Sequence, residues 1–396
     1  MPGLYDLPVE LLSQIGENLD DDDDFLALRL ASGKLNHVFR EMHMSSLYKS
    51  RRVFTMKASV ENLIKVSKNP TANYRVEHLV ISDRPPYPPD LRRFPMRIIP
   101  WLEPLTGSNN DPQGLFPKIT DYINDEQDLS TSSASAEWTA LFAIAFTNLP
   151  NIRSIKLESP PLALTRKEYN LFYPGLELGP GKRIPVKLDE TAGRYYPERH
   201  ALSGKTWPRL LSAVYVARLS KIEAISTGYE LPGKWFRRPE TQYIAFGSLF
   251  KNLTHLDLKI GLDWEDCLSF NELPFLNSDW LCKWLSSLGG SLKSLLLCCN
   301  MSRYEPRNGQ PLLIKKCQLP NLETFGVTDG LLENEDLKLF IWECKGTLRS
   351  LVFDGCYLDQ EDRWDEIFEY ISKECRGLRA LQRDGESVLA CQQSFG

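Results

Sequence analysis

Two six-residue segments, Leu292-Lys-Ser-Leu295-Leu-Leu297 and residues 322–327 (Leu-Glu-Thr-Phe-Gly-Val), share one pattern. Large apolar residues occupy the first, fourth and sixth positions, and the residues between them are small, polar or charged in most copies. Because side chains alternate between the two faces of a strand, the fourth and sixth positions share one face. The pattern therefore predicts a short strand that is buried on one face.

The same pattern recurs along the chain, and further copies begin at Val76, Ile152, Ile222, Leu253, Leu348 and Leu378. The last five starts are separated by 39, 30, 26 and 30 residues (292−253, 322−292, 348−322, 378−348). Segments with helical periodicity precede three of these copies, over residues 279–288, 333–344 and 362–375. One helix–strand unit cannot bury both of its faces, so such units must stack on their neighbours.

This unit resembles the leucine-rich repeat, whose period is about 20–29 residues. The resemblance implies an α/β solenoid with parallel strands on a concave face and helices on the convex face. It also implies that Asn300 and Cys356 bond the turn backbones of adjacent units. The alternative is an ordinary doubly wound α/β sheet, which a Gly-rich phosphate loop would support, but neither GxGxxG nor GxxxxGK[ST] occurs.

The first fifty residues have a different pattern, which predicts three helices. Asp6 is suited to cap the first helix, and Pro8 fits its first turn. A stripe with helical spacing follows at Leu7, Leu11, Leu12, Ile15 and Leu19. Ser32 is suited to cap the third helix. A unit of about 45 residues has a small core and would be marginally stable alone, so we expect it to dock onto another surface.

Five consecutive aspartates, Asp20 to Asp24, separate the first two predicted helices. A calcium-binding EF-hand loop requires Gly at its sixth position and Glu at its twelfth. Counted from Asp20, those positions hold Phe25 and Ala31, which excludes that loop. Acidic residues before a helix favour the positive end of its dipole, so the run is interpreted as the start of the second helix.

The N-terminal segment resembles an F-box, through Leu7-Pro8-Val-Glu-Leu-Leu12, Leu28-Arg-Leu30, Ser32 and the pair Val38-Phe39. Gly16 and Gly33 depart from the family pattern. The resemblance implies docking onto the Skp-type adaptor of a cullin-based ubiquitin ligase. The contact residues that it implies are Leu7, Pro8, Leu11, Ile15, Leu19 and Leu26. Alternatively, the same leucines form a helical cap on the domain that follows.

The predicted fold class is therefore α/β, with a three-helix F-box at residues 1–50, a linker helix at 51–75 and a repeat solenoid at 76–396. Prolines and polar runs predict two long loop insertions in the solenoid, at about 84–136 and 158–209.

Composition and charge exclude several classes of protein. The chain is 42% hydrophobic and 25% charged, as in soluble globular proteins, and its net charge of −5 argues against a nucleic-acid partner. The nine cysteines are odd in number and form no CxxC motif, so we expect reduced thiols and no metal or cofactor. Without a signal-peptide pattern or a long apolar run, we expect no membrane contact and a cytoplasmic or nuclear location.

No catalytic motif is present, and a His255–Asp257 pair on one face of a strand lacks an identifiable nucleophile. We expect no enzymatic activity. Strand alternation predicts a concave substrate-binding face of mixed charge that displays His255, Asp257, Lys259, Leu296, Thr328 and Asp354. The F-box resemblance implies that the chain is the substrate-recognition subunit of a cullin-based ubiquitin ligase. Its expected partners are a Skp-type adaptor, a cullin and a protein substrate. A non-ligase interaction scaffold is the main alternative, and an unrecognised hydrolase is a remote one.

Overall fold

The protein is described from a computed structural model of the 396-residue chain. The structure describes residues 4, 7–17, 22–55, 57–82, 132–158, 163–164, 184–185, 197–229, 231–232, 247–261, 279–288, 290–299, 314, 317–359 and 363–388.

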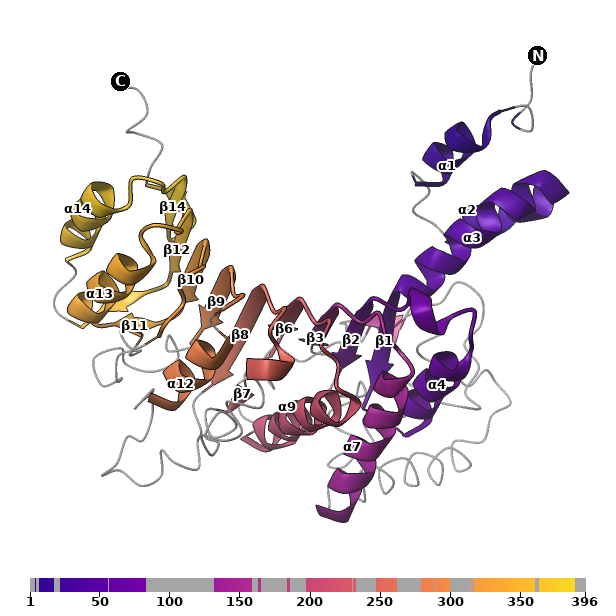
Figure 1. Ribbon diagram of the computed structural model, residues 1–396, viewed down its shortest axis with the longest axis horizontal. Coiled ribbons are helices and arrows are strands. Elements are labelled where there is room, and N and C mark those ends of the chain that lie inside the picture. The colour runs from indigo at the N-terminus through magenta and orange to yellow at the C-terminus, as the bar shows by residue number, and fades with distance from the viewer. Residues whose placement is uncertain are drawn as a thin grey trace.

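One long sheet forms the centre of the molecule, and its strands follow one another in sequence order (Figure 1). Nine of its strands are parallel neighbours: β1 (Ser50–Phe54), β2 (His78–Ser82), β3 (Ser154–Glu158), β6 (Ala224–Thr227), β8 (His255–Gly261), β9 (Ser294–Cys298), β10 (Thr324–Thr328), β12 (Ser350–Asp354) and β14 (Ala380–Arg383). All eight copies of the apolar pattern form strands, as predicted.

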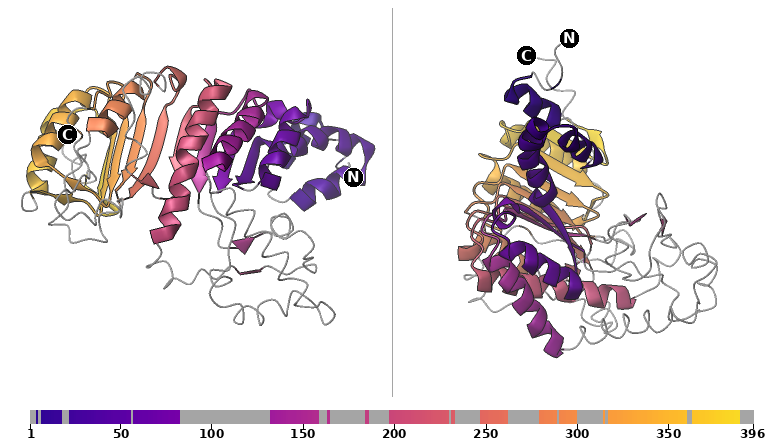
Figure 2. Two further views of the ribbon diagram at one scale, coloured as in Figure 1. Left: turned by 90° about the horizontal axis from the view of Figure 1, so that it is seen from below. Right: turned by 90° about the vertical axis from the view of Figure 1, so that its right-hand side faces the viewer.

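The helices lie on the outer face of the curved sheet (Figure 1), and Figure 2 shows them side by side along the long axis. They are α4 (Lys57–Lys68), α7 (Ser132–Thr147), α9 (Pro197–Ala217), α12 (Asp279–Leu288), α13 (Asn334–Cys344) and α14 (Trp364–Glu374), with a 3-10 turn η2 (Asn73–Arg75) before β2. This is the solenoid that the leucine-rich-repeat pattern predicts, with parallel strands inside the curve and helices outside.

The core lies between the sheet and these helices and runs through consecutive repeats without a break. The second and fourth residues of the strands point into it, and aromatic rings link one repeat to the next. The ring of Phe325 lies 4.6 Å from that of Phe340 on α13 and 6.4 Å from that of Phe353 on β12. β10 therefore packs against the helix that follows it and against the next strand, β12.

A backbone ladder joins the repeats at the edge where the strands begin. For the strands from β2 to β12 of the long sheet, the carbonyl of the residue before the strand accepts two N–H groups from the next repeat, as Lys293 O does from Glu323 and Thr324. Asparagine side chains add a second ladder at the same edge. Asn321 Nδ2 donates to Gly290 O at 2.9 Å, and Asn252 Nδ2 donates to Ser220 O at 2.7 Å. Asn151 Nδ2 donates to Tyr74 O at 2.8 Å in the same way.

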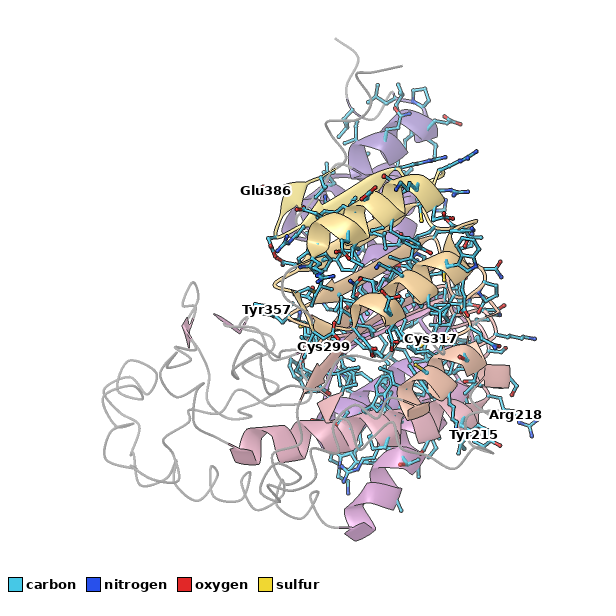
Figure 3. The ribbon with its side chains drawn as sticks, turned by 90° about the vertical axis from the view of Figure 1, so that its left-hand side faces the viewer. Tyr215, Arg218, Cys299, Cys317, Tyr357 and Glu386 are labelled. Atoms are coloured by element: carbon cyan, nitrogen blue, oxygen red, sulfur yellow. The ribbon has the colours of Figure 1, made fainter. Side chains whose placement is uncertain are left out.

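The opposite edge, where the strands end, is bonded by different groups. Cys356 Sγ donates to Val327 O of the preceding repeat at 3.1 Å, which confirms the role expected of this cysteine. Asn300, for which the same role was expected, lies outside the described residues. Figure 3 shows Tyr357 and Glu386 at this edge of the stack, and Tyr215 and Arg218 at the other.

The array ends in a tight hairpin that covers its last strand. β15 (Glu386–Ser387) pairs antiparallel with β14, and the two turn residues, Asp384 and Gly385, have φ values of 51° and 81°. Two positive φ values are those of a type I′ turn, for which Asp-Gly is a preferred sequence. The hairpin therefore reduces the unpaired edge that a parallel array would otherwise expose.

Three further short strand pairs are described. β11 (Leu331–Leu332) pairs with β13 (Tyr357–Leu358), β4 (Ala163–Leu164) pairs with β5 (Ile184–Pro185), and β7 (Leu231–Pro232) pairs with β8.

The solenoid begins earlier than predicted, because the segment expected as a linker helix, 51–75, contributes both β1 and α4. The sequence pattern missed β1 because Arg51 occupies the position where β2 has Leu79. The guanidinium of Arg51 lies 5.5 Å from the centre of the Tyr48 ring, and burial lowers its pKa.

The two predicted insertions also have different limits. The expected loop 84–136 ends at Ser132, where α7 begins. The expected loop 158–209 begins after β3, which includes Glu158, and α9 already starts at Pro197. Pro208 lies inside α9, although proline disfavours a helix interior. The burial of Trp207, Leu210 and Val214 on the same helix offsets that cost.

Three helices precede the sheet: α1 (Val9–Glu17), α2 (Asp22–Ala31) and α3 (Gly33–Lys49). Ser32 caps α3 as predicted, and its hydroxyl accepts from Leu35 N at 3.1 Å. α3 runs directly into β1 and contacts β1 and η2, so it joins the helical unit to the end of the solenoid (Figure 1).

Candidate functional site

The N-terminal helical unit has its own small core, separate from that of the solenoid. Leu12 of α1 and Leu35 and Phe39 of α3 are fully buried together. Leu7, Ile15 and Leu28, among other residues, pack against them and are partly buried. Three large side chains on a unit this size leave much apolar surface without cover.

Exposed apolar side chains remain on α1 and α2. Leu11 is 45% exposed, Val9 is 52% exposed and Leu30 is 79% exposed. Pro8 is also exposed, directly before α1. The unit therefore presents apolar groups to solvent on two of its helices.

The six predicted adaptor contacts do not share one environment. Pro8 and Leu11 are exposed, whereas Leu7 and Ile15 are partly buried in the core of the unit itself. Leu26 lies in α2, but its side chain is outside the described part of the chain, as is all of Leu19. Val9 and Leu30 were not among the predicted contacts, because those contacts were the positions that the F-box resemblance implied.

The second candidate site is the concave face of the sheet, which displays the first, third and fifth residues of the strands. The strand register brings these positions into rows that cross the sheet. All six predicted substrate-binding residues are on this face: His255, Asp257, Lys259, Leu296, Thr328 and Asp354. They fall into two regions of different character.

The half from β1 to β8 is charged, and its charges pair with one another. Arg52 of β1 lies 2.6 Å from Glu158 of β3, and Lys156 lies 3.0 Å from the same carboxylate. Burial raises the pKa of Asp257, although the positive charges of Lys259 and Lys156 oppose the shift. The sequence pattern did not indicate the cluster of Arg52, Lys156 and Glu158, because β1 and β3 lie far apart in the chain and β1 does not match the pattern.

His255 is held within its own turn rather than by Asp257. Its Nδ1 lies 2.8 Å from Thr254 Oγ1, and that hydroxyl donates to Glu223 O at 3.0 Å. The histidine is thus tied to the edge of the sheet where the strands begin.

The half from β9 to β14 is neutral in its first and third rows. We call this region the neutral patch, and its residues are Ser294, Leu296, Thr324, Gly326, Ser350, Val352, Ala380 and Gln382. Leu296 is its most apolar exposed member, with 37% of its surface accessible. Its side chain leans over Gly326, where an added Cβ would lie 2.6 Å from Leu296 Cδ2 and 3.5 Å from Val352 Cβ.

Acidic residues border the neutral patch where the strands end. Asp354 is the last residue of β12, and Asp329 directly follows β10 with a φ of 53°. Burial and the negative charge of Asp354 raise the pKa of Asp329. The next carboxylate, Asp384, lies 3.3 Å from Arg383 Nε and accepts from Gly355 N.

Within the described ranges, no group of three or more His, Cys, Asp or Glu side chains is arranged to hold a metal ion. None of the seven cysteines in those ranges is in a disulfide, and burial raises the pKa of the Cys344 and Cys356 thiols to about 12. Such thiols are poor nucleophiles at neutral pH. None of the helices in the same ranges combines the length and hydrophobicity of a membrane span.

No family model and no curated protein matches the sequence. Among solved structures, the chain is similar to the leucine-rich repeat-containing protein LegL7 from Legionella pneumophila. The two are 12% identical over 86% of this chain and 92% of that chain, with a TM-score of 0.29. The solenoid fold is established by the strand order and register of this chain, and not by this likeness.

Proposed function

We propose that this chain is a substrate-recognition subunit of a cullin-based ubiquitin ligase. In this proposal, the N-terminal helical unit binds a Skp-type adaptor and the concave face binds a protein substrate. The observation that carries it is the exposure of Val9, Leu11 and Leu30 on a unit whose sequence resembles an F-box. A subunit of this kind needs no catalytic group, because holding the substrate near a ubiquitin-charged enzyme raises the effective concentration of its lysines.

The arrangement of the two surfaces supports this division of labour. The helical unit lies at the N-terminal end of the solenoid and is joined to it by α3, whereas the concave face extends from β1 to β14 (Figure 1). An adaptor held at the end of the solenoid would leave the C-terminal strands open to a second protein.

The test is retention of the full chain on an immobilised Skp-type adaptor. Leu11→Asp with Pro8→Ala changes two exposed positions, so we expect the fold to survive and adaptor retention to fall at least about tenfold. Leu7→Asp is less suitable, because Leu7 packs against the buried Leu12 and its loss would disturb the unit itself. Circular dichroism checks that the double variant is folded.

Leu339→Asp is the matched control, since Leu339 is 46% exposed on α13, nearly the same fraction as Leu11, but lies at the other end of the solenoid. It should leave adaptor retention unchanged. Wild-type protein that does not bind the adaptor contradicts the proposal. Binding of the adaptor without copurification of a cullin would instead favour an interaction scaffold that does not assemble a ligase.

A further inference from the structure

The concave face divides into two chemically different halves, and this division indicates which half takes a ligand. From β1 to β8, cations and anions lie side by side on the face, as in the contacts of Arg52 and Lys156 with Glu158. A ligand charge that docks there must compete with pairs that already exist. From β9 to β14, the neutral patch has no charges in its first and third rows.

The neutral patch is suited to an apolar side chain that is flanked by small polar groups. Leu296 projects from the face, and Gly326 and Val352 continue the same row on the next two strands. The hydroxyls of Ser294, Thr324 and Ser350 form the neighbouring row, two residues earlier on the same three strands. An apolar contact over Leu296 beside a row of hydroxyls matches the common arrangement of protein interfaces, in which polar groups surround an apolar centre.

The border of the patch supplies the charge preference. Asp329 N donates to Asp354 O at 2.7 Å, so the two residues are neighbours across the strand ends, and the charge of Asp354 contributes to raising the pKa of Asp329. A ligand cation placed between the two carboxylates would relieve this repulsion, whereas a ligand anion would increase it. Lys259 is on the same row as Asp354 but three strands away, across Cys298 and Thr328.

We propose that the neutral patch binds an extended peptide segment with a large apolar side chain over Leu296 and a lysine or arginine directed at Asp329 and Asp354. This inference rests on the proposed substrate-binding role of the concave face and narrows it to strands β9 to β14. Two strand positions and two strand spacings separate Leu296 from Asp354, so the apolar and basic residues of the peptide are about two to four residues apart.

The experiment is selection of a random dodecapeptide phage library on the immobilised full chain. Enriched peptides should contain a large apolar residue and, within about four positions of it, lysine or arginine in roughly threefold excess over their frequency in the unselected library. The best peptide is then labelled with fluorescein and titrated against the variants by fluorescence anisotropy.

Leu296→Glu places a charge in the patch at an exposed position and should weaken binding of that peptide about tenfold. Asp329→Asn with Asp354→Asn should remove the preference for lysine and arginine in a repeated selection while the apolar preference persists. Glu335→Gln is the matched control, because it removes an exposed carboxylate from α13 outside the concave face, and it should change neither preference.

Enrichment of acidic peptides, or no enrichment over uncoated beads, overturns the inference. So does a basic preference that persists in the double asparagine variant. Dimerisation of the wild type that Leu296→Glu abolishes would mean that a second copy covers the patch, and it also overturns the inference. Adaptor retention by the N-terminal unit is measured separately, so failure here is distinguishable from failure of the ligase proposal.

Discussion

Lys293 Nζ lies 3.1 Å from Glu323 Oε1, and the two residues occupy the same position, directly before the strand, in neighbouring repeats. The charges along this edge alternate over most of its length. Arg153 pairs with Glu223 at 3.7 Å in the same way. In strand order, the residues at this position are Lys49, Glu77, Arg153, Glu223, Thr254, Lys293, Glu323, Arg349 and Arg379. Positive and negative side chains are neighbours along this edge only when adjacent strands are in the observed register.

Reversal of one charge in this ladder should destabilise the solenoid modestly. Glu323→Lys brings a third cation between Lys293 and Arg349, and we expect a loss of up to about 1 kcal/mol in unfolding free energy, since the pair is half exposed. Glu323→Gln, which only removes the charge, should cost less. Urea denaturation at low and high salt measures both, and the difference should shrink at high salt because the charges are screened. A loss independent of salt would contradict the electrostatic explanation.

The asparagine ladder should contribute more per residue than the charge ladder. Asn321→Ala removes the amide that donates to Gly290 O at 2.9 Å, and we expect a loss of about 0.5–1.5 kcal/mol. Asn321→Asp preserves the shape of the side chain but replaces the donor with an acceptor facing a carbonyl, so it should be at least as destabilising. Equilibrium urea unfolding gives both values. A fully stable aspartate variant would show that the hydrogen bond is not needed.

Gly355 should be far less tolerant of substitution than Gly346. Gly355 has a φ of 58°, and an added Cβ would lie 2.6 Å from Asp329 Oδ1, whereas a Cβ on Gly346 would meet open space. We expect Gly355→Ala to cost about 1–2 kcal/mol, because both the backbone conformation and the contact are unfavourable. Gly346→Ala should be neutral or slightly stabilising. Thermal unfolding compares the pair, and equal effects would refute the assignment of strain to Gly355.

Asp329 should make stability depend on pH. Burial and the charge of Asp354 raise its folded-state pKa above the ordinary value of 3.8. The fold therefore favours the protonated carboxyl, so the contribution of Asp329 is fully present below about pH 3.8 and is lost as the pH rises through the raised pKa. Asp329→Asn should thus stabilise the protein at neutral pH, and this gain should shrink towards acidic pH.

Unfolding by urea at several pH values between about 3.5 and 7 tests this expectation. Because asparagine also tolerates the positive φ of residue 329, part of the gain will not depend on pH. Only the pH-dependent part reports the charge. In an Asp354→Asn background that part should diminish, since the neighbouring charge is absent. A stability gain from Asp329→Asn that increases towards acidic pH would contradict this expectation.

The repeat pattern was sufficient to predict most of the solenoid. Leu295 and Leu297, and their counterparts in seven other copies, alternate with a period that only a strand can place on one face. The helices at 279–288, 333–344 and 362–375 also agree with α12, α13 and α14 within two residues. The first strand was missed because Arg51 stands where other strands have an aliphatic residue. The start of α9 was missed because the prolines earlier in the range 158–209 suggested a loop.

For eight of the nine parallel strands, the sequence by itself determined which residues form the strand and which side of it is buried, because both follow from local periodicity and hydrophobicity. Only the tertiary structure decided which exposed residues become neighbours. Lys293 and Glu323 are thirty residues apart in the chain, and Arg52 and Glu158 are separated by still more, yet stacking brings each pair into contact. The tertiary structure also decided which leucines of α1 are buried. Packing against α3 covers Leu12 and leaves the adjacent Leu11 exposed.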